Sequence, residues 1–311
     1  MKKIILLIML VLFIGCSSES EQVQTNVGVL RGPSGMGMSY LMDKDDTNYI
    51  FTLAGAPEEI TAGIISGSLD IAMVPTNLAS TLYNVTNGEV NIIAVSTLGV
   101  LFVLDATGEI HEIEDLRGRT INISGQGAIP QFAFEHVLQS NGLIPGVDVN
   151  IIFNAEHTEL AALMVAGNVE IGLLPQPFVT TVTNQNENIR IALDLTEEWE
   201  SANPGSSMVQ TAIIVRTEFL ENHRDIVIQF LSDSAESVHF VNNNISEAAE
   251  IIGRLDIVPS QIAAQAIPRT NLVHITGGEM RRLVEGFLQV LYDANAMSVG
   301  GTLPSENFFF E

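Results

Sequence analysis

The chain has 311 residues, of which 37 are acidic and 13 basic, so its formal net charge at pH 7 is −24. Such an excess of acid excludes nucleic acid as a partner, because a phosphate-binding surface needs clustered Lys and Arg. The length and a hydrophobic content of 46% suffice for two lobes with separate cores. A single cysteine excludes an internal disulfide, and six scattered histidines without metal-ligand spacing indicate no metal site.

Residues 1–15 have the pattern of a secretory signal. Two lysines precede an apolar run over 4–14, which ends at Gly15 and Cys16. The run is too short for a membrane-spanning helix, which needs about 20 apolar residues. The position of the lone cysteine resembles a bacterial lipobox, whose cysteine is lipidated after cleavage. We therefore expect a lipid-anchored tether over 16–25 and an extracytoplasmic location on a bacterial membrane. The alternative is an ordinary signal with a coincidental cysteine.

From residue 26 onward, strands and helices alternate as in a doubly wound parallel sheet. Continuous apolar runs predict the strands. Segments that open with Pro, Ser, Thr or acidic residues predict the helices. The expected strands are 26–30, 49–53, 69–74 and 90–95, and the expected helices are 35–42, 57–66 and 76–83.

The same order returns from residue 119. The expected strands are 120–124, 149–153, 169–173 and 189–193, and the expected helices are 129–140, 157–166 and 176–183. A polar loop follows over 197–207, and then an apolar strand over 211–215, which we expect to return to the first lobe and pair near 100–104. The rest of the chain is helical in pattern, over 226–241, 246–255, 260–266 and 278–294.

One motif occurs twice. The sequence SGSLDIAMVP at 66–75 aligns without a gap with AGNVEIGLLP at 166–175. Each copy ends a helix at Gly, continues through an apolar strand and stops at Pro. The spacing is too long for a solenoid and fits two similar α/β lobes with a cleft between them. We predict one lobe from 26–104 and 212–311 and the other from 105–211, each a doubly wound sheet with helices on both faces.

Ligands of doubly wound sheets bind beyond the carboxyl ends of the strands, where loops lead into helix N-termini. In both halves these loops carry small or neutral hydrogen-bonding residues. Helix capping is the alternative role of Ser34, Thr76 and Asn77, and a solvated helix end is that of His157. The expected ligand-binding residues are Ser34, Gly35, Met36, Pro57, Thr76, Asn77, Thr97, Ser124, Gln126, Gly127, His157, Gln176 and Phe178.

The sequence carries no recognisable catalytic motif. The glycine-rich segments at 32–37 and 125–127 match neither GxGxxG nor a P-loop, and neither a GxSxG motif nor a cysteine nucleophile near a base occurs. We therefore expect a protein that is not an enzyme and uses no cofactor. Trp199, in the polar loop, is expected to be a lid or packing residue.

Four segments together resemble a known family. RGPSGMG at 31–37, SGSLDIA at 66–72, DLRGRT at 115–120 and LPQP at 174–177 look like the nitrate, sulfonate, taurine and thiamine-pyrimidine group of ABC-importer substrate-binding proteins. The resemblance spans nearly all of the chain beyond the signal. It implies a type II periplasmic binding protein fold and a monomer that holds a small organic solute, resembling a sulfonate, nitrate or a pyrimidine vitamin precursor. It also implies an ABC permease and ATPase as partners.

A related enzyme branch makes the thiamine pyrimidine, so a small-molecule enzyme of this type is the alternative. That branch carries a cysteine-rich motif and a cofactor-bound lysine. Here Cys16 is the only cysteine, and Lys44 is the only lysine beyond the predicted signal. Both departures argue against that chemistry.

Overall fold

The computed structural model describes residues 23–45 and 48–310. The predicted signal peptide and lipidation site Cys16 lie outside these residues. Among the described helices, none is both long and apolar enough to cross a membrane.

The first of two sheets gathers strands from both ends of the chain. We call this sheet and its helices the first lobe. Its strands are β1 (Thr25–Leu30), β2 (Tyr49–Ala54), β3 (Ile71–Pro75), β4 (Val90–Leu98), β10 (Val209–Arg216) and β11 (Leu272–Ile275). Its helices are α1 (Pro33–Met42), α2 (Pro57–Ser66), α3 (Thr76–Val85), α8 (Thr217–Asn222), α9 (Arg224–Asn243), α10 (Ile245–Arg254), α11 (Ser260–Ala266) and α12 (Gly277–Ala294), followed by the short 3-10 helix η3 (Ala296–Val299).

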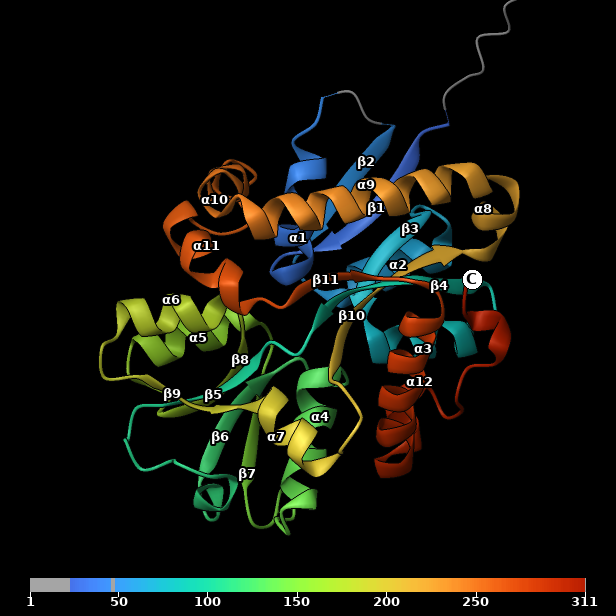
Figure 1. Cartoon of the computed structure of the whole chain (residues 1–311). Coiled ribbons are helices and arrows are strands. Elements are labelled where there is room, and N and C mark those ends of the chain that lie inside the picture. Colours follow the sequence, from blue (N-terminus) through green and yellow to red (C-terminus); the bar gives the residue numbers. More distant parts are fainter. Residues whose placement is uncertain (1–22, 46–47, 311) are drawn as a thin grey trace, which may run out of the picture.

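The second sheet and its helices form the second lobe, built from the middle of the chain (Figure 1). Its strands are β5 (Leu101–Asp105), β6 (Thr120–Ser124), β7 (Asn150–Asn154), β8 (Ile171–Pro175) and β9 (Arg190–Asp194). Its helices are α4 (Ile129–Ser140), α5 (His157–Val165), α6 (Phe178–Gln185) and α7 (Leu195–Ala202), with the 3-10 helix η1 (Ile113–Leu116).

The two sheets share one topology, apart from β11, an additional edge strand of the first. The strand order is β11-β4-β10-β3-β1-β2 in the first and β7-β6-β8-β5-β9 in the second. In each, the first strand of the repeat pairs in parallel with the next two, and one antiparallel strand is inserted between the third and the fourth. The predicted α/β class with two similar lobes is confirmed.

The repeated motif occupies equivalent places in the two lobes. Gly67 and Gly167 both adopt left-handed backbone conformations, with φ of 76° and 74°, just after α2 and α5. Glycine reaches this conformation without the steric cost that a Cβ imposes. The strands that follow, β3 and β8, both end at the proline of the motif.

Helices cover both faces of the first sheet. Because side chains alternate along a strand, Ile71 and Met73 of β3 join the core beneath α1 and α9, and Ala72 and Val74 join the core beneath α2, α3 and α12. Figure 1 shows α9 lying across one face of this sheet.

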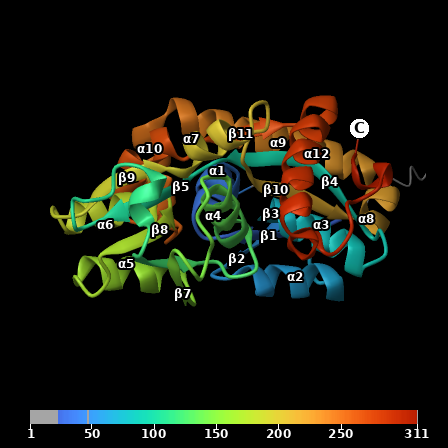
Figure 2. The same cartoon turned by 90° about the horizontal axis from the view of Figure 1, so that it is seen from below.

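The core beneath α2, α3 and α12 continues into the second lobe. Trp199 of α7 is fully buried and its ring lies 5.1 Å from that of Phe287 in α12, and α12 also contacts α4. Figure 2 shows α4 in the middle of the molecule, with α5 and α6 to one side and α3 and α12 to the other. Trp199 is therefore a packing residue between the lobes.

Three sequence predictions differ from the structure. Residues 100–104 do not pair with the returning strand, because the chain has already crossed at Gly99 and Val100, so that β5 pairs with β8 and β9. The returning strand β10 pairs with β3 and β4 instead.

The predicted polar loop over 197–207 overlaps most of α7, which begins at Leu195. Its N-cap is Asp194, whose carboxylate accepts a hydrogen bond from the Thr196 N–H at 2.9 Å. Leu195 and Trp199, one turn apart, supply its buried face. Because the residues between them are mostly polar and acidic, the apolar spacing typical of a helix was not recognised in the sequence. The region after Glu218 is also not wholly helical, because the four residues of β11 add an edge strand beside β4.

Candidate functional site

A cavity of about 770 Å³ lies between the lobes. Equivalent loops from the two repeats line it, each at the carboxyl end of a strand. Residues of 31–34 face those of 125–128, residues 55–58 correspond to 154–157, and Pro75 corresponds to Pro175. Parallel strands present their carboxyl ends at one edge, so two such sheets joined by a hinge place six loops around one space.

Six predicted ligand-binding residues line this cavity. They are Ser34, Pro57, Gln126, Gly127, His157 and Phe178. They come from five loops, and both lobes contribute. Contact of these residues with a ligand stays a prediction.

The other predicted residues do not line the cavity. Met36 lies in the core of the first lobe, and Gly35 lets α1 approach β1, since a Cβ there would come 3.1 Å from the Leu30 carbonyl oxygen. The remaining five, buried next to lining residues, are Thr76, Asn77, Thr97, Ser124 and Gln176.

Asn77 connects the lobes. Its Nδ2 donates hydrogen bonds to the carbonyl oxygen of Gly127, at 3.2 Å, and to that of Ser298 in η3, at 3.0 Å. Gly127 belongs to the glycine loop of the second lobe, and Ser298 to the first lobe. Asn77 therefore holds the position of a cavity-lining loop without lining the cavity itself.

Several buried polar atoms near the cavity have no hydrogen-bond partner in the described part of the chain. Asn154 and Gln210 line the cavity, and their carbonyl oxygens Oδ1 and Oε1 are both without a donor. Four further buried atoms next to the lining also lack a partner, namely Thr76 Oγ1, Asn77 Oδ1, Thr97 Oγ1 and Gln176 Nε2. A buried polar atom left unpaired costs free energy, so this group is suited to a polar ligand or to water.

His157 is uncharged at neutral pH. Burial lowers its pKa from 6.5 to about 4. Its Nδ1 hydrogen-bonds the Ser124 hydroxyl, and its ring lies 5.3 Å from that of Phe178. The pair presents an aromatic surface and a neutral imidazole to the cavity, rather than a cation.

Sequence reasoning missed part of the lining. Gln210 and Thr211 belong to the cavity because β10 inserts between β3 and β4, where Thr211 lies opposite both Pro75 and Thr97. A strand's insertion point is set by long-range pairing, and the local pattern gives no signal for it. Other missed residues are of two kinds: Leu30 and Phe153 are strand-end apolar residues that look like ordinary core, and four polar or charged residues lie in the cavity loops, namely Arg31, Glu58, Asn154 and Glu156.

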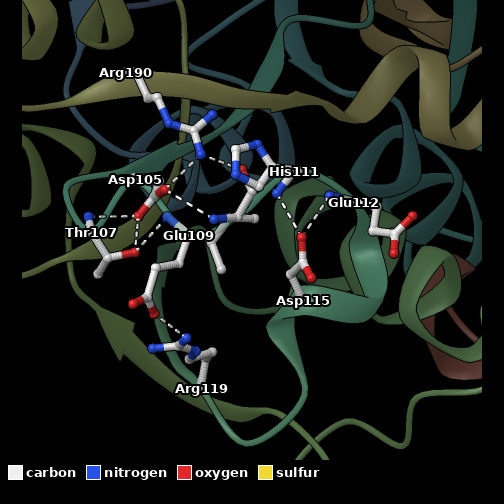
Figure 3. Close-up of polar contacts among 9 residues, drawn as sticks. Asp105, Thr107, Glu109, His111, Glu112, Asp115, Arg119 and Arg190 are labelled. Carbon is white, nitrogen blue, oxygen red and sulfur yellow. Dashed lines mark hydrogen bonds and ion pairs between the residues drawn. The ribbon is translucent and has the colours of Figure 1, made fainter.

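The most strongly connected carboxylate lies elsewhere (Figure 3). Asp105 is fully buried and accepts hydrogen bonds from Thr107, from the Ile110 N–H and from Arg190 Nη2, the last at 2.9 Å. Burial alone would raise the pKa of Asp105, but these partners outweigh it and lower the pKa. Asp105 lies opposite Ile171, at the start of β8, and so at the far end of the second sheet from the cavity. Its role is structural.

The described residues offer little for catalysis. Lys44 pairs with Glu236 at 3.1 Å and stacks over Tyr40, and it does not line the cavity. No group of three or more His, Cys, Asp or Glu suited to a metal ion occurs in the ranges 23–45 and 48–310.

The two lobes and the cavity between them match the architecture of type II periplasmic binding proteins. An ABC transporter structure from Parabacteroides distasonis is similar at a TM-score of 0.77 and 23% identity, covering 94% of this chain and 99% of that one. The periplasmic aliphatic sulphonate binding protein SsuA from Escherichia coli is similar at a TM-score of 0.70 and 13% identity, covering 90% of this chain and 92% of that one. The periplasmic nitrate-binding protein NrtA from Synechocystis PCC 6803 is similar at a TM-score of 0.59 and 14% identity, covering 77% of this chain and 69% of that one.

At the level of sequence, the family model described as NMT1/THI5 like matches residues 89–248, and the chain belongs to this family. This confirms the resemblance drawn from the four motifs. A comparison with curated protein sequences finds no match.

Proposed function

We propose that this protein is the extracytoplasmic solute-binding component of an ABC importer. It closes two lobes on a small organic solute, of the sulfonate, nitrate or pyrimidine-precursor kind, and delivers it to a permease driven by an ATPase. The observation that carries the proposal is the cavity, lined by equivalent loops of both repeats at the carboxyl ends of their strands. The neighbours named as sulphonate- and nitrate-binding proteins support it through their common fold.

Closure follows from where the cavity lies. A ligand that touches both lobes binds the closed form better than the open form, and this difference in affinity is what shifts the population. Two chain crossings, at Gly99–Val100 and between α7 and β10, connect the lobes and would form the hinge. We propose that the protein acts as a monomer, anchored by lipid at Cys16.

A screen tests the proposal directly. Purified protein without its signal is heated with sulfonates, nitrate, pyrimidines, flavins and amino-acid derivatives, because a bound ligand raises the melting temperature by mass action. A compound that stabilises the protein should also reduce its radius of gyration in solution scattering. Stabilisation without compaction contradicts the closing cleft. Turnover of a bound compound, lost on Gln126→Ala, supports the enzyme alternative instead.

A further inference from the structure

The charged side chains that border the cavity are mainly acidic. Glu58 and Glu156 contribute carboxylates, and among the described lining residues Arg31 is the one permanent cation. The Arg31 guanidinium is already engaged, since it donates to the carbonyl oxygen of Asp256 and lies 3.9 Å from the carboxylate of that residue. The one permanent cation of the lining is therefore already paired with Asp256 through Nη1, and the two carboxylates of the lining disfavour an anion.

Backbone N–H groups compensate for this only in part. Six helices, α1 to α6, begin at the cavity, and in three of them (α1, α2 and α4) Pro33, Pro57 or Pro130 occupies the first turn and carries no N–H. In the glycine loop the Gly127 N–H donates to Gln131 Oε1 at 2.8 Å. In the opposite loop, the Ala155 N–H donates to Glu159 Oε2 at 3.0 Å. Helix N-termini attract anions through free N–H groups and the dipole, and here both are partly neutralised.

The two unpaired atoms that belong to lining residues are acceptors. Asn154 and Gln210 line the cavity, and their buried amide oxygens Oδ1 and Oε1 lack donors among the described residues. An amide oxygen accepts hydrogen bonds and cannot donate them. Nitrate and sulfonate at neutral pH also only accept, so they leave both oxygens unpaired. A ligand with N–H or O–H groups satisfies them.

We infer that the cleft selects an uncharged or cationic organic solute that donates hydrogen bonds and carries a flat ring, and that it discriminates against nitrate and sulfonates. The His157–Phe178 pair supplies the surface for the ring, and a cavity of about 770 Å³ is far larger than an inorganic anion requires. This inference rests on the proposed solute-binding function and narrows its ligand.

The test uses three probes with one ring and three charges: benzenesulfonate, benzamide and benzamidine, together with nitrate. Their affinities for the purified protein are measured by ligand-observed NMR and calorimetry. We expect benzamide and benzamidine to bind at least about tenfold more tightly than benzenesulfonate, because leaving one buried polar group unpaired costs about that much in affinity. Nitrate should not bind. N,N-dimethylbenzamide, which lacks N–H groups, should bind more weakly than benzamide.

Paired variants separate the local charge from the net charge. E58Q/E156Q should lower the affinity for benzamidine about fivefold, a small effect because each exposed charge pair contributes little. The affinity for benzamide should stay unchanged. E221Q/E250Q makes the same change in net charge on exposed residues of the first lobe away from the cavity, and it should alter neither affinity. Benzenesulfonate or nitrate binding as tightly as benzamide overturns the inference and leaves the proposed function intact. Failure of every probe to bind overturns the inference, whereas the proposed function fails only if the thermal screen also finds no ligand.

Discussion

Asn77 of the first lobe donates a hydrogen bond across the cleft to the carbonyl oxygen of Gly127 in the second, at 3.2 Å. The same Nδ2 holds Ser298 at 3.0 Å, so one buried amide joins a lining loop to the body of the other lobe. Bonds that exist only when two lobes meet contribute to closure as well as to folding.

Asn77→Ala should weaken closure. Losing a buried donor that serves two carbonyls costs about 1–3 kcal/mol, which corresponds to a tenfold to hundredfold loss of ligand affinity if it falls on the closed state. Calorimetry and solution scattering measure affinity and compaction. The matched control is Asn84→Ala, because Asn84 Nδ2 donates to Val299 and Thr302 within the first lobe. Equal behaviour of the two variants in scattering contradicts the cross-lobe role.

Gly99→Ala should destabilise the first chain crossing. An added Cβ would overlap the side chain of Thr196, and overpacking of this kind costs about 1–3 kcal/mol. Urea unfolding gives the loss of stability, and Thr196→Ala should restore part of it. Gly286→Ala is the control, since nothing lies within 4 Å of its added Cβ and alanine in a helix gains about 0.5–1 kcal/mol over glycine. A Gly99→Ala variant as stable as the parent shows that the crossing is not tightly packed.

His157 should make stability pH-dependent. Its pKa is lowered from 6.5 to about 4 on folding, so the unfolded chain binds the proton more readily. The contribution is therefore fully present above pH 6.5 and declines as the pH falls from there toward 4. Melting temperatures of the parent and of His157→Asn should differ by a constant amount above pH 6.5 and come closer together as the pH falls from 6.5 toward 4. His239→Asn removes an exposed histidine and should follow the parent curve; if His157→Asn does so too, the assignment is wrong.

Asp105→Asn should cost more stability than a comparable change on the surface. The variant leaves Arg190 and two backbone N–H groups without their carboxylate, a loss of about 3 kcal/mol for a buried partner. Asp43→Asn is the control, because Asp43 and Arg254 form an exposed pair at 2.6 Å, worth less than about 1 kcal/mol. Chemical denaturation near pH 7 gives both values.

The lowered pKa of Asp105 also predicts how its contribution to stability changes in acid. Its stabilisation is present above the ordinary aspartate pKa of 3.8 and is lost as the pH falls below it. The gap between parent and Asp105→Asn should therefore close in acid. A gap that is constant down to pH 2 contradicts the assignment.

Cys16→Ala should release the protein from membranes. The lone cysteine follows Gly15 and an apolar run over 4–14, and an acylated cysteine adds about 0.8 kcal/mol of membrane affinity per buried CH₂. Detergent phase partitioning of cells that produce the parent or the variant measures this. Equal recovery of both in the detergent phase rules out a lipid anchor at this residue.

The sequence by itself determined the class of the fold. Pro57, Gly67 and Pro75 mark the start of a helix, its end and the end of the next strand, because these residues act through local backbone geometry. Gly167 and Pro175 repeat the last two of these signals. Helices 57–66, 129–140 and 260–266 are predicted to the residue. The lobe arrangement followed from the repetition of this order, and the family from the motifs within it.

Only the tertiary structure decided which polar residues surround the cavity. Asn77 and Gln176 look like cleft residues from their place after a proline, yet both are fully buried, whereas Gln210 reaches the cavity through the insertion of β10. Helix α7 was missed because its burial depends on Phe287, 88 residues later in the chain. Local pattern encodes backbone conformation, but the surroundings of a side chain depend on segments distant in sequence that only folding brings together.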